Sequence, residues 1–144
     1  PAKLISELRA LRRLMLRHPA ANNQHSMALF LSRGYHESLI KNLHRTYKAR
    51  FEIMSEELSN IMPVSVATTA FGGSSFWIEG PETLNARVLA AEAKKIGIII
   101  EPGDLHFYGP RPPTHFFRLG FSAIKTEQIR PGIKLLADLI TQLS

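Results

Sequence analysis

The stretch that decides the fold places one guanidinium inside an otherwise aromatic and aliphatic pattern: His115-Phe116-Phe117-Arg118-Leu119-Gly120-Phe121-Ser122. Side chains of a β-strand alternate between the two faces of its sheet. Alternation assigns three large apolar side chains to one face, namely Phe117, Leu119 and Phe121. We therefore predict a strand with one face in the core and with Arg118 on the other face.

Arg118 is the candidate binding residue of this strand. An arginine stays charged at ordinary pH, and its planar fork of N–H donors matches a carboxylate with two parallel hydrogen bonds. Gly120 lies on the same face and leaves room for such an anion. The spacing fits equally an arginine on an edge strand, with its head reaching solvent along its own stem. The pattern alone leaves both interpretations open.

The composition bounds the kind of protein. The chain has 144 residues, 44% hydrophobic and 21% charged, which is typical of one globular domain. It has no cysteine, which excludes disulfides, thiolate zinc sites and cysteine nucleophiles. No apolar run approaches the roughly 20 residues of a membrane helix, so we expect a cytoplasmic protein without membrane contact. The chain begins Pro1-Ala2-Lys3 without methionine, and we expect it to be a piece of a longer protein.

The positive charge is concentrated at the start of the chain. The net charge is +6, of which residues 1–18 supply +4, because Glu7 is the one acid among Lys3, Arg9, Arg12, Arg13 and Arg17. No aromatic platform or nucleic-acid motif accompanies these residues. We interpret them as a solvated helix face, or one that meets another domain, rather than as a direct nucleic-acid contact.

The periodicity changes at Pro63 from helical to strand-like. Before it we predict helices over 3–17, 24–33 (capped by Asn22 or Asn23 and ended by Gly34) and 36–60. After it we predict strands over 64–69, 75–79, 98–100, 105–108 and around Arg118, with helices over 82–96 and 126–143, the latter capped by Thr126. The fold class is α+β: a helical N-terminal part with one long bridging helix, then a small, mainly antiparallel sheet covered by helices. The expected domains are 1–34, 35–62 and 63–144.

Other candidate sites carry weaker patterns. Gly72 and Gly73 fit a hairpin turn or a loop bent over a ligand. Glu101 and Asp104 could form a carboxylate pair, but acids in a turn are more commonly solvated. The six histidines lack the spacing of metal ligands, and no complete catalytic set is visible, so we predict neither a metal site nor catalytic residues.

The order of several motifs resembles the carboxy-terminal part of a fold-type I aminotransferase. More closely it resembles the aminotransferase-like half of the MocR branch of GntR-type bacterial transcription regulators. The motifs are Asn22-Asn23-Gln24, Ala28-Leu29-Phe30-Leu31, Gly34, Tyr47 with Arg50, Phe71-Gly72-Gly73 with Trp77, Gly97-Ile98, Pro102-Gly103-Asp104 and Phe117-Arg118-Leu119-Gly120-Phe121-Ser122.

The resemblance implies an effector-binding role. In that family a winged-helix head is fused to a body that binds pyridoxal 5′-phosphate and often an amino compound. The match places Arg118 at the arginine that holds the carboxylate of the amino-acid ligand, and Gly72 and Gly73 in a loop near the site mouth. The family's Schiff-base lysine, aspartate and most phosphate contacts would precede Pro1, so we expect the isolated chain neither to hold the cofactor nor to catalyse transamination.

The implied partners are an N-terminal large domain, a winged-helix domain, an amino-acid-like effector and a second copy in a homodimer. The apolar faces of the first three helices would then be partly exposed when the large domain is absent. Two other functions remain open: part of a pyridoxal-phosphate-dependent class I/II aminotransferase, or a stand-alone basic binding module.

Overall fold

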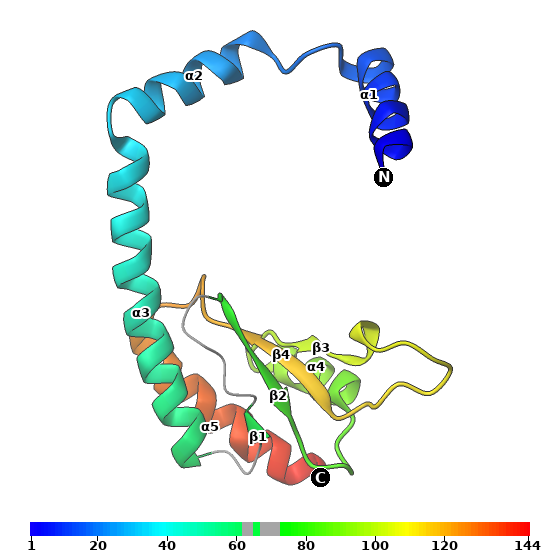
Figure 1. Ribbon diagram of the computed structural model, residues 1–144. Coiled ribbons are helices and arrows are strands. Elements are labelled where there is room, and N and C mark those ends of the chain that lie inside the picture. Colours follow the sequence, from blue (N-terminus) through cyan, green and yellow to red (C-terminus); the bar gives the residue numbers. More distant parts are fainter. Residues whose placement is uncertain (62–64, 67–72) are drawn as a thin grey trace. The chain divides into compact units, whose positions relative to one another are not determined.

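The computed structural model describes residues 1–61, 65–66 and 73–144 (Figure 1). The chain divides into two compact units, residues 1–43 and 44–144. Helix α3, Tyr35–Ile61, begins in the first unit and ends in the second. The expected division into domains 1–34, 35–62 and 63–144 remains a prediction.

The first unit is helical and lacks a buried core of its own. Helices α1, Ala2–Leu16, and α2, Ala21–Ser32, bury none of their residues. Gly34 takes the left-handed conformation that ends α2, with φ of 72°, as predicted. The predicted asparagine cap is wrong, because α2 begins at Ala21 and both Asn22 and Asn23 lie inside it. The apolar stripe of α1 is exposed, as expected: Leu4, Leu8, Leu11 and Met15.

The second unit is built on a four-stranded antiparallel sheet with strand order β1-β2-β4-β3. The strands are β1 Ser65–Val66, β2 Ser75–Glu79, β3 Glu101–Pro102 and β4 Phe116–Gly120. The α+β class and the antiparallel sheet are confirmed. Strand β4 pairs with β2 on one side and β3 on the other, so Arg118 does not lie on an edge strand. The edge-strand part of that interpretation is wrong, whereas its solvent-exposed arginine is confirmed, because the Arg118 side chain is 47% exposed.

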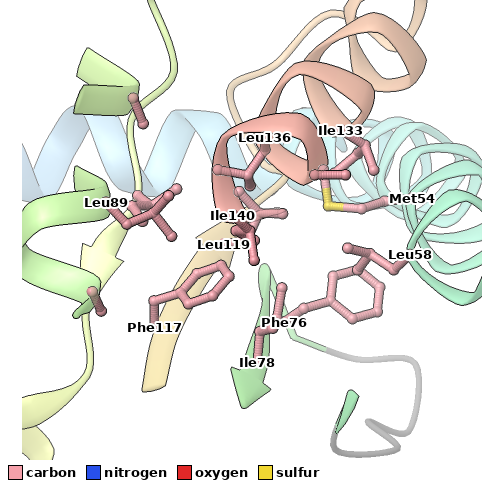
Figure 2. Close-up of a cluster of buried hydrophobic side chains, with 14 of the residues drawn as sticks. Met54, Leu58, Phe76, Ile78, Leu89, Phe117, Leu119, Ile133, Leu136 and Ile140 are labelled. Carbon is pink, nitrogen blue, oxygen red and sulfur yellow. The ribbon is translucent and has the colours of Figure 1, made fainter. Parts of the chain in front are cut away.

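Helices α3, α4 and α5 contribute to a core on one face of the sheet (Figure 2). The predicted alternation of β4 is confirmed, because Phe117, Leu119 and Phe121 are each at most 5% exposed. Burying a side chain of this size contributes about 1.5–3 kcal/mol. The core also includes Met54, Leu58, Phe76, Ile78, Leu89, Ile129, Ile133, Leu136 and Ile140.

Aromatic rings join the middle of α3 to the sheet. Phe51 on α3 stacks on Phe76 of β2 with ring centroids 5.1 Å apart. Phe121 lies 5.6 Å from Phe76 and 6.0 Å from Phe51, and Tyr47 meets it edge-on at 6.2 Å. Such pairs add about 0.5–1.5 kcal/mol each beyond area burial. The long helix is therefore held to the strand segment that carries Arg118.

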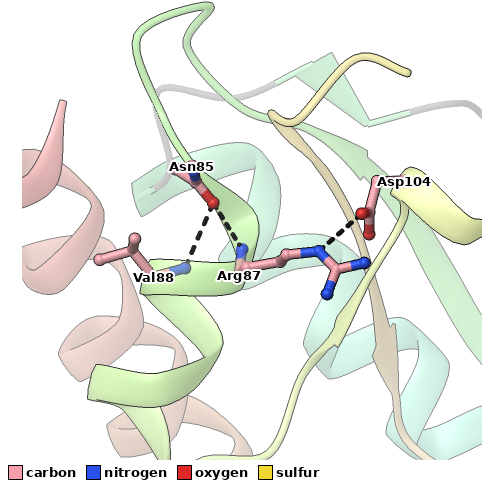
Figure 3. Close-up of polar contacts among 4 residues, drawn as sticks. All are labelled: Asn85, Arg87, Val88 and Asp104. Carbon is pink, nitrogen blue, oxygen red and sulfur yellow. Dashed lines mark hydrogen bonds and ion pairs between the residues drawn. The ribbon is translucent and has the colours of Figure 1, made fainter. Parts of the chain in front are cut away.

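Helix α4, Ala86–Lys95, is shorter than the predicted 82–96. Asn85 caps it, with Oδ1 accepting from the backbone N–H groups of Arg87 at 3.0 Å and Val88 at 3.3 Å (Figure 3). Its buried residues are Ala86, Leu89 and Ala93, whereas Val88 and Ile96 are exposed.

The third predicted strand, 98–100, is wrong, and the strand lies at Glu101–Pro102 instead. Gly97 has φ of 82°, and the N–H of Ile98 donates to the carbonyl of Ala93 at 2.9 Å. This bond belongs to a Schellman motif, which ends a helix. The backbone of Ile98 is therefore used to close α4 and does not begin a strand. Ile99 is consequently 83% exposed.

Two further predictions are wrong in detail. The segment expected as a strand at 105–108 begins with a 3-10 helix, η1, at Asp104–His106. Helix α5 spans Thr126–Leu143 as predicted, but Thr126 is its first residue and makes no side-chain cap. Residues 71 and 72 of the predicted glycine turn and residues 64 and 67–69 of the strand predicted over 64–69 lie outside the described residues, while residues 65 and 66 of that strand form β1.

Candidate functional site

Arg118 lies in the middle of β4 on the sheet face opposite the core. Its register partners are Trp77 on β2 and Glu101 on β3. Its side chain is 47% exposed, whereas its neighbours Phe117 and Leu119 are buried. The buried side chains of Phe117 and Leu119 thus anchor β4 in the core, and the guanidinium of Arg118 points to solvent from the other face.

Glu101 is the immediate partner of that guanidinium. Arg118 Nη2 donates a hydrogen bond to Glu101 Oε2. The other carboxylate oxygen, Oε1, lies 3.6 Å from Nε2 of His106. Sequence reasoning did not find this contact, because it considered Glu101 with Asp104 and placed the strand at 98–100. A strand assigned over 101–102 would have revealed it through the antiparallel register.

A hollow of about 280 Å³ opens beside Arg118. A Cβ added to Gly120 would meet nothing nearer than the Ser74 carbonyl oxygen at 3.9 Å, so the space expected beside Arg118 exists. Hydroxyl groups, an arginine and a carboxylate in one hollow can bind a small polar ligand that carries an anionic group. Its lining consists of Ser74, Ser75, Ile99, Ile100, Glu101, Arg118, Gly120 and Ser122.

The turn after β3 is fastened to the rest of the unit. The N–H of Gly103 donates to the carbonyl of Phe116 at 2.7 Å. Arg87 Nε donates to Asp104 Oδ2, also at 2.7 Å (Figure 3). The Asp104 side chain is 12% exposed, so it is not the solvated turn acid that the sequence suggested. The turn therefore holds β3, and Glu101 with it, against β4.

Aromatic side chains form a surface next to Arg118. Trp77 stacks on Phe116 with centroids 5.9 Å apart and meets the ring of His106 edge-on at 5.5 Å. Phe107 packs on Phe116 at 5.1 Å. The rings cover the part of the sheet beyond Arg118 and place η1 over it.

The two glycines of the predicted loop have different outcomes. Gly73 is exposed, and a Cβ on it would have only backbone atoms of Ser75 nearby, at 3.8 Å and farther. Gly72 lies outside the described residues, so a ligand role for either glycine stays a prediction.

At the other end of the hollow, Arg50 of α3 donates through Nη1 to the carbonyl of Ser122 and fixes the segment that follows β4.

A second, larger hollow of about 580 Å³ lies between the end of α4 and the start of α5. Its lining is almost entirely apolar, and Ser122 and Gln128 are the polar side chains among the described residues around it. In the described ranges, no three histidine or acidic side chains come together as metal ligands would. Nor does any helix there have the length and apolarity to cross a membrane. Of these two hollows, the one beside Arg118 is the one whose described lining carries charged side chains.

No family model matches the chain. The HTH-type transcriptional regulator TauR of Rhodobacter capsulatus is 35% identical over 95% of this chain and 28% of its own length. Kynurenine aminotransferase of Pyrococcus horikoshii is 31% identical over 79% of this chain and 28% of that chain, with a TM-score of 0.68. The chain is an aminotransferase-like segment.

A third protein shows how much of the fold is shared. The α-aminoadipate aminotransferase LysN of Thermus thermophilus matches 98% of the aminotransferase-like segment and 36% of that chain, with a TM-score of 0.81 and 24% identity. The segment spans under a third of the length of the regulator. The resemblance to aminotransferases and to a helix-turn-helix regulator is thereby confirmed, whereas the assignment to the MocR branch stays a prediction.

Proposed function

We propose that this segment is the C-terminal effector-binding part of a pyridoxal-phosphate-dependent regulator of the GntR/MocR type. Arg118 binds the carboxylate of an amino-acid effector. The observation that carries the proposal is the half-exposed Arg118 beside its hollow, in a chain 35% identical to a transcriptional regulator. The paired N–H donors of the guanidinium match a carboxylate, and Gly120 leaves space for it.

The similar aminotransferases support pyridoxal 5′-phosphate as the cofactor of the parent protein. The Pyrococcus enzyme is described in complex with PMP and the Thermus enzyme with N-(5′-phosphopyridoxyl)-L-leucine. Among the described residues that line the hollow there is no lysine, so they supply no amine for a Schiff base. The segment fits the carboxylate end of an amino-acid ligand, and the groups that hold pyridoxal 5′-phosphate would come from elsewhere in the parent protein.

The same proposal includes the remaining partners. A large domain and a winged-helix domain would complete the parent protein, which would bind DNA in the cytoplasm as a homodimer. The exposed apolar stripe of α1 supports a covering domain, since such a stripe is normally buried. Gly72 and Gly73 would lie in the loop at the mouth of the site.

Substitution of Arg118 in the full-length protein loaded with pyridoxal 5′-phosphate tests the proposal. The twenty standard amino acids, β-alanine and γ-aminobutyrate are titrated by calorimetry, and the tightest binder becomes the probe. Arg118→Ala should weaken its binding by about 1.5–3 kcal/mol, the value of a hydrogen bond to a charged group. Arg118→Lys keeps the charge but loses the fork, so it should recover only part of the affinity.

Arg111→Ala is the matched control, because it removes the same charge from an exposed loop residue outside the hollow. It should leave the affinity unchanged. An Arg118→Ala protein that binds the probe as tightly as the parent would refute the assignment.

The second candidate function is a pyridoxal-phosphate-dependent aminotransferase, favoured by the 31% identity to the Pyrococcus enzyme. Arg118 serves either function and does not distinguish them. Amino-group transfer from an amino acid to 2-oxoglutarate by the full-length protein would favour the enzyme. Amino-acid-dependent DNA binding without turnover would favour the regulator.

A further inference from the structure

We propose that Glu101 is an internal competitor for Arg118, so that a ligand carboxylate reaches the guanidinium only by displacing the Glu101 carboxylate. Glu101 would then be a specificity-determining residue of the hollow. The inference rests on the proposed function for the class of ligand, an amino acid or another carboxylate. The contact itself is a property of the sheet.

Backbone pairing brings the two charges together. Glu101 and Arg118 are direct register partners of β3 and β4. Side chains of opposed residues in an antiparallel pair leave the same face of the sheet, with Cβ atoms about 4.5–5.5 Å apart. The strand register therefore holds the carboxylate within reach of the guanidinium whether or not a ligand is present.

The turn prevents Glu101 from withdrawing with its strand. Gly103 is bonded to Phe116 at 2.7 Å, and Asp104 is bonded to Arg87 at 2.7 Å. Both contacts lie within three residues of Glu101 and tie the turn to β4 and α4. A ligand must therefore displace the Glu101 side chain, since these contacts resist movement of β3.

The contact is open enough to be exchanged. The Arg118 and Glu101 side chains are 47% and 44% exposed, so water and small anions reach both. An exposed ion pair is weak, and a ligand carboxylate that binds the same donors can replace it. The apparent dissociation constant of the ligand rises as the fraction of free Arg118 falls. The negative charge of Glu101 also disfavours ligands with a second anionic group near the first.

The first test needs no cofactor and uses acetate as a bare carboxylate. In the 144-residue chain labelled with ¹⁵N, the Nε–H signal of Arg118 is followed by NMR during acetate titration at constant ionic strength. Glu101→Gln, which keeps the size of the side chain, should tighten acetate binding about two- to tenfold. Glu79→Gln removes the same charge from a β2 residue outside the hollow and should leave binding unchanged.

Three results of the acetate titration would overturn the competitor role. If Glu101 instead positions Arg118 for its ligand, Glu101→Gln weakens acetate binding, and the competitor role is overturned. Equal binding by the Glu101→Gln and parent chains, including no detectable binding by either, also overturns it. So does a Glu79→Gln chain that gains as much affinity as Glu101→Gln, because the effect would then be general electrostatics.

The second test separates this inference from the proposed function. In the full-length protein, the amino-acid probe defined above should bind about two- to tenfold more tightly to Glu101→Gln. If Arg118→Ala weakens the probe and Glu101→Gln does not tighten it, the competitor role fails and the effector site stands. If acetate binding tightens in Glu101→Gln but Arg118→Ala leaves the amino-acid probe unaffected, the competitor role stands and the effector assignment fails.

Discussion

Gly103→Ala would test the close approach that fastens the turn after β3 to the sheet. An added Cβ would lie 2.6 Å from Cη2 of Trp77 and 2.8 Å from the carbonyl oxygen of Phe116. Unstrained carbon contacts are about 3.5–4.0 Å, so the methyl group overlaps the ring by about 1 Å. The Trp77 ring is stacked on Phe116, and the oxygen belongs to the backbone of β4, so neither moves freely.

The cost is steric, because Gly103 has φ of −87° and ψ of −11°, which alanine adopts without strain. Overpacking of this kind costs about 1–3 kcal/mol. Replacing glycine also reduces the conformational entropy of the unfolded chain, which stabilises the folded state by about 0.4–1 kcal/mol and offsets part of this cost. We expect Gly103→Ala to lower the free energy of unfolding by about 1–2 kcal/mol.

Urea denaturation of the chain, followed by Trp77 fluorescence, measures this difference. Gly132→Ala is the matched control, because a Cβ there meets nothing within 4 Å and the residue lies inside α5. A helical glycine costs about 0.5–1 kcal/mol relative to alanine, so this control should be stabilised by that amount. Gly103→Ala with unfolding free energy equal to or above that of the parent would show that the turn is not tightly packed on Trp77.

Two further substitutions test the core and its buried acid. Phe121→Ala, at a ring 1% exposed, should lower the unfolding free energy by about 3–5 kcal/mol, measured by thermal unfolding. Its control, Tyr108→Ala, removes a fully exposed ring and should change the unfolding free energy by less than about 0.5 kcal/mol. A loss near 1 kcal/mol at Phe121 would argue against the aromatic contacts with α3. Arg130→Ala removes the Nη1 donor that lies 2.6 Å from the buried Glu57 and should lower the unfolding free energy by about 1.5–3 kcal/mol in urea titrations. Lys48→Ala, from an exposed pair, is its control, and equal effects of the two would contradict a buried role for Glu57.

The sequence predicted those parts of the fold whose signal is periodic and local. Strand β4 shows period-two alternation, and α3 and α5 show long apolar stripes, so all three lie close to their expected bounds. Strand β3 was missed because the Ile98 backbone completes the end of α4, a hydrogen bond that apolar periodicity does not report.

The site was predictable only in part for a similar reason. Arg118 is visible as a lone charge in an apolar strand, and its outward direction follows from alternation. Its partner Glu101 lies 17 residues away and meets it through the pairing of two strands. Register of that kind depends on the packing of the whole sheet, and Asp104, the acid with which the sequence suggested pairing Glu101, bonds Arg87 instead.

The β3 edge of the sheet has a consequence for self-association by strand addition. An exposed outer strand is a template on which another chain can extend a sheet, and many aggregates begin in this way. Strand β3 is only two residues long, and its second residue, Pro102, has no backbone N–H to offer. Strand β3 therefore offers a second chain few backbone groups for hydrogen bonding. The sheet edge near Arg118 can stay accessible to small molecules without promoting aggregation.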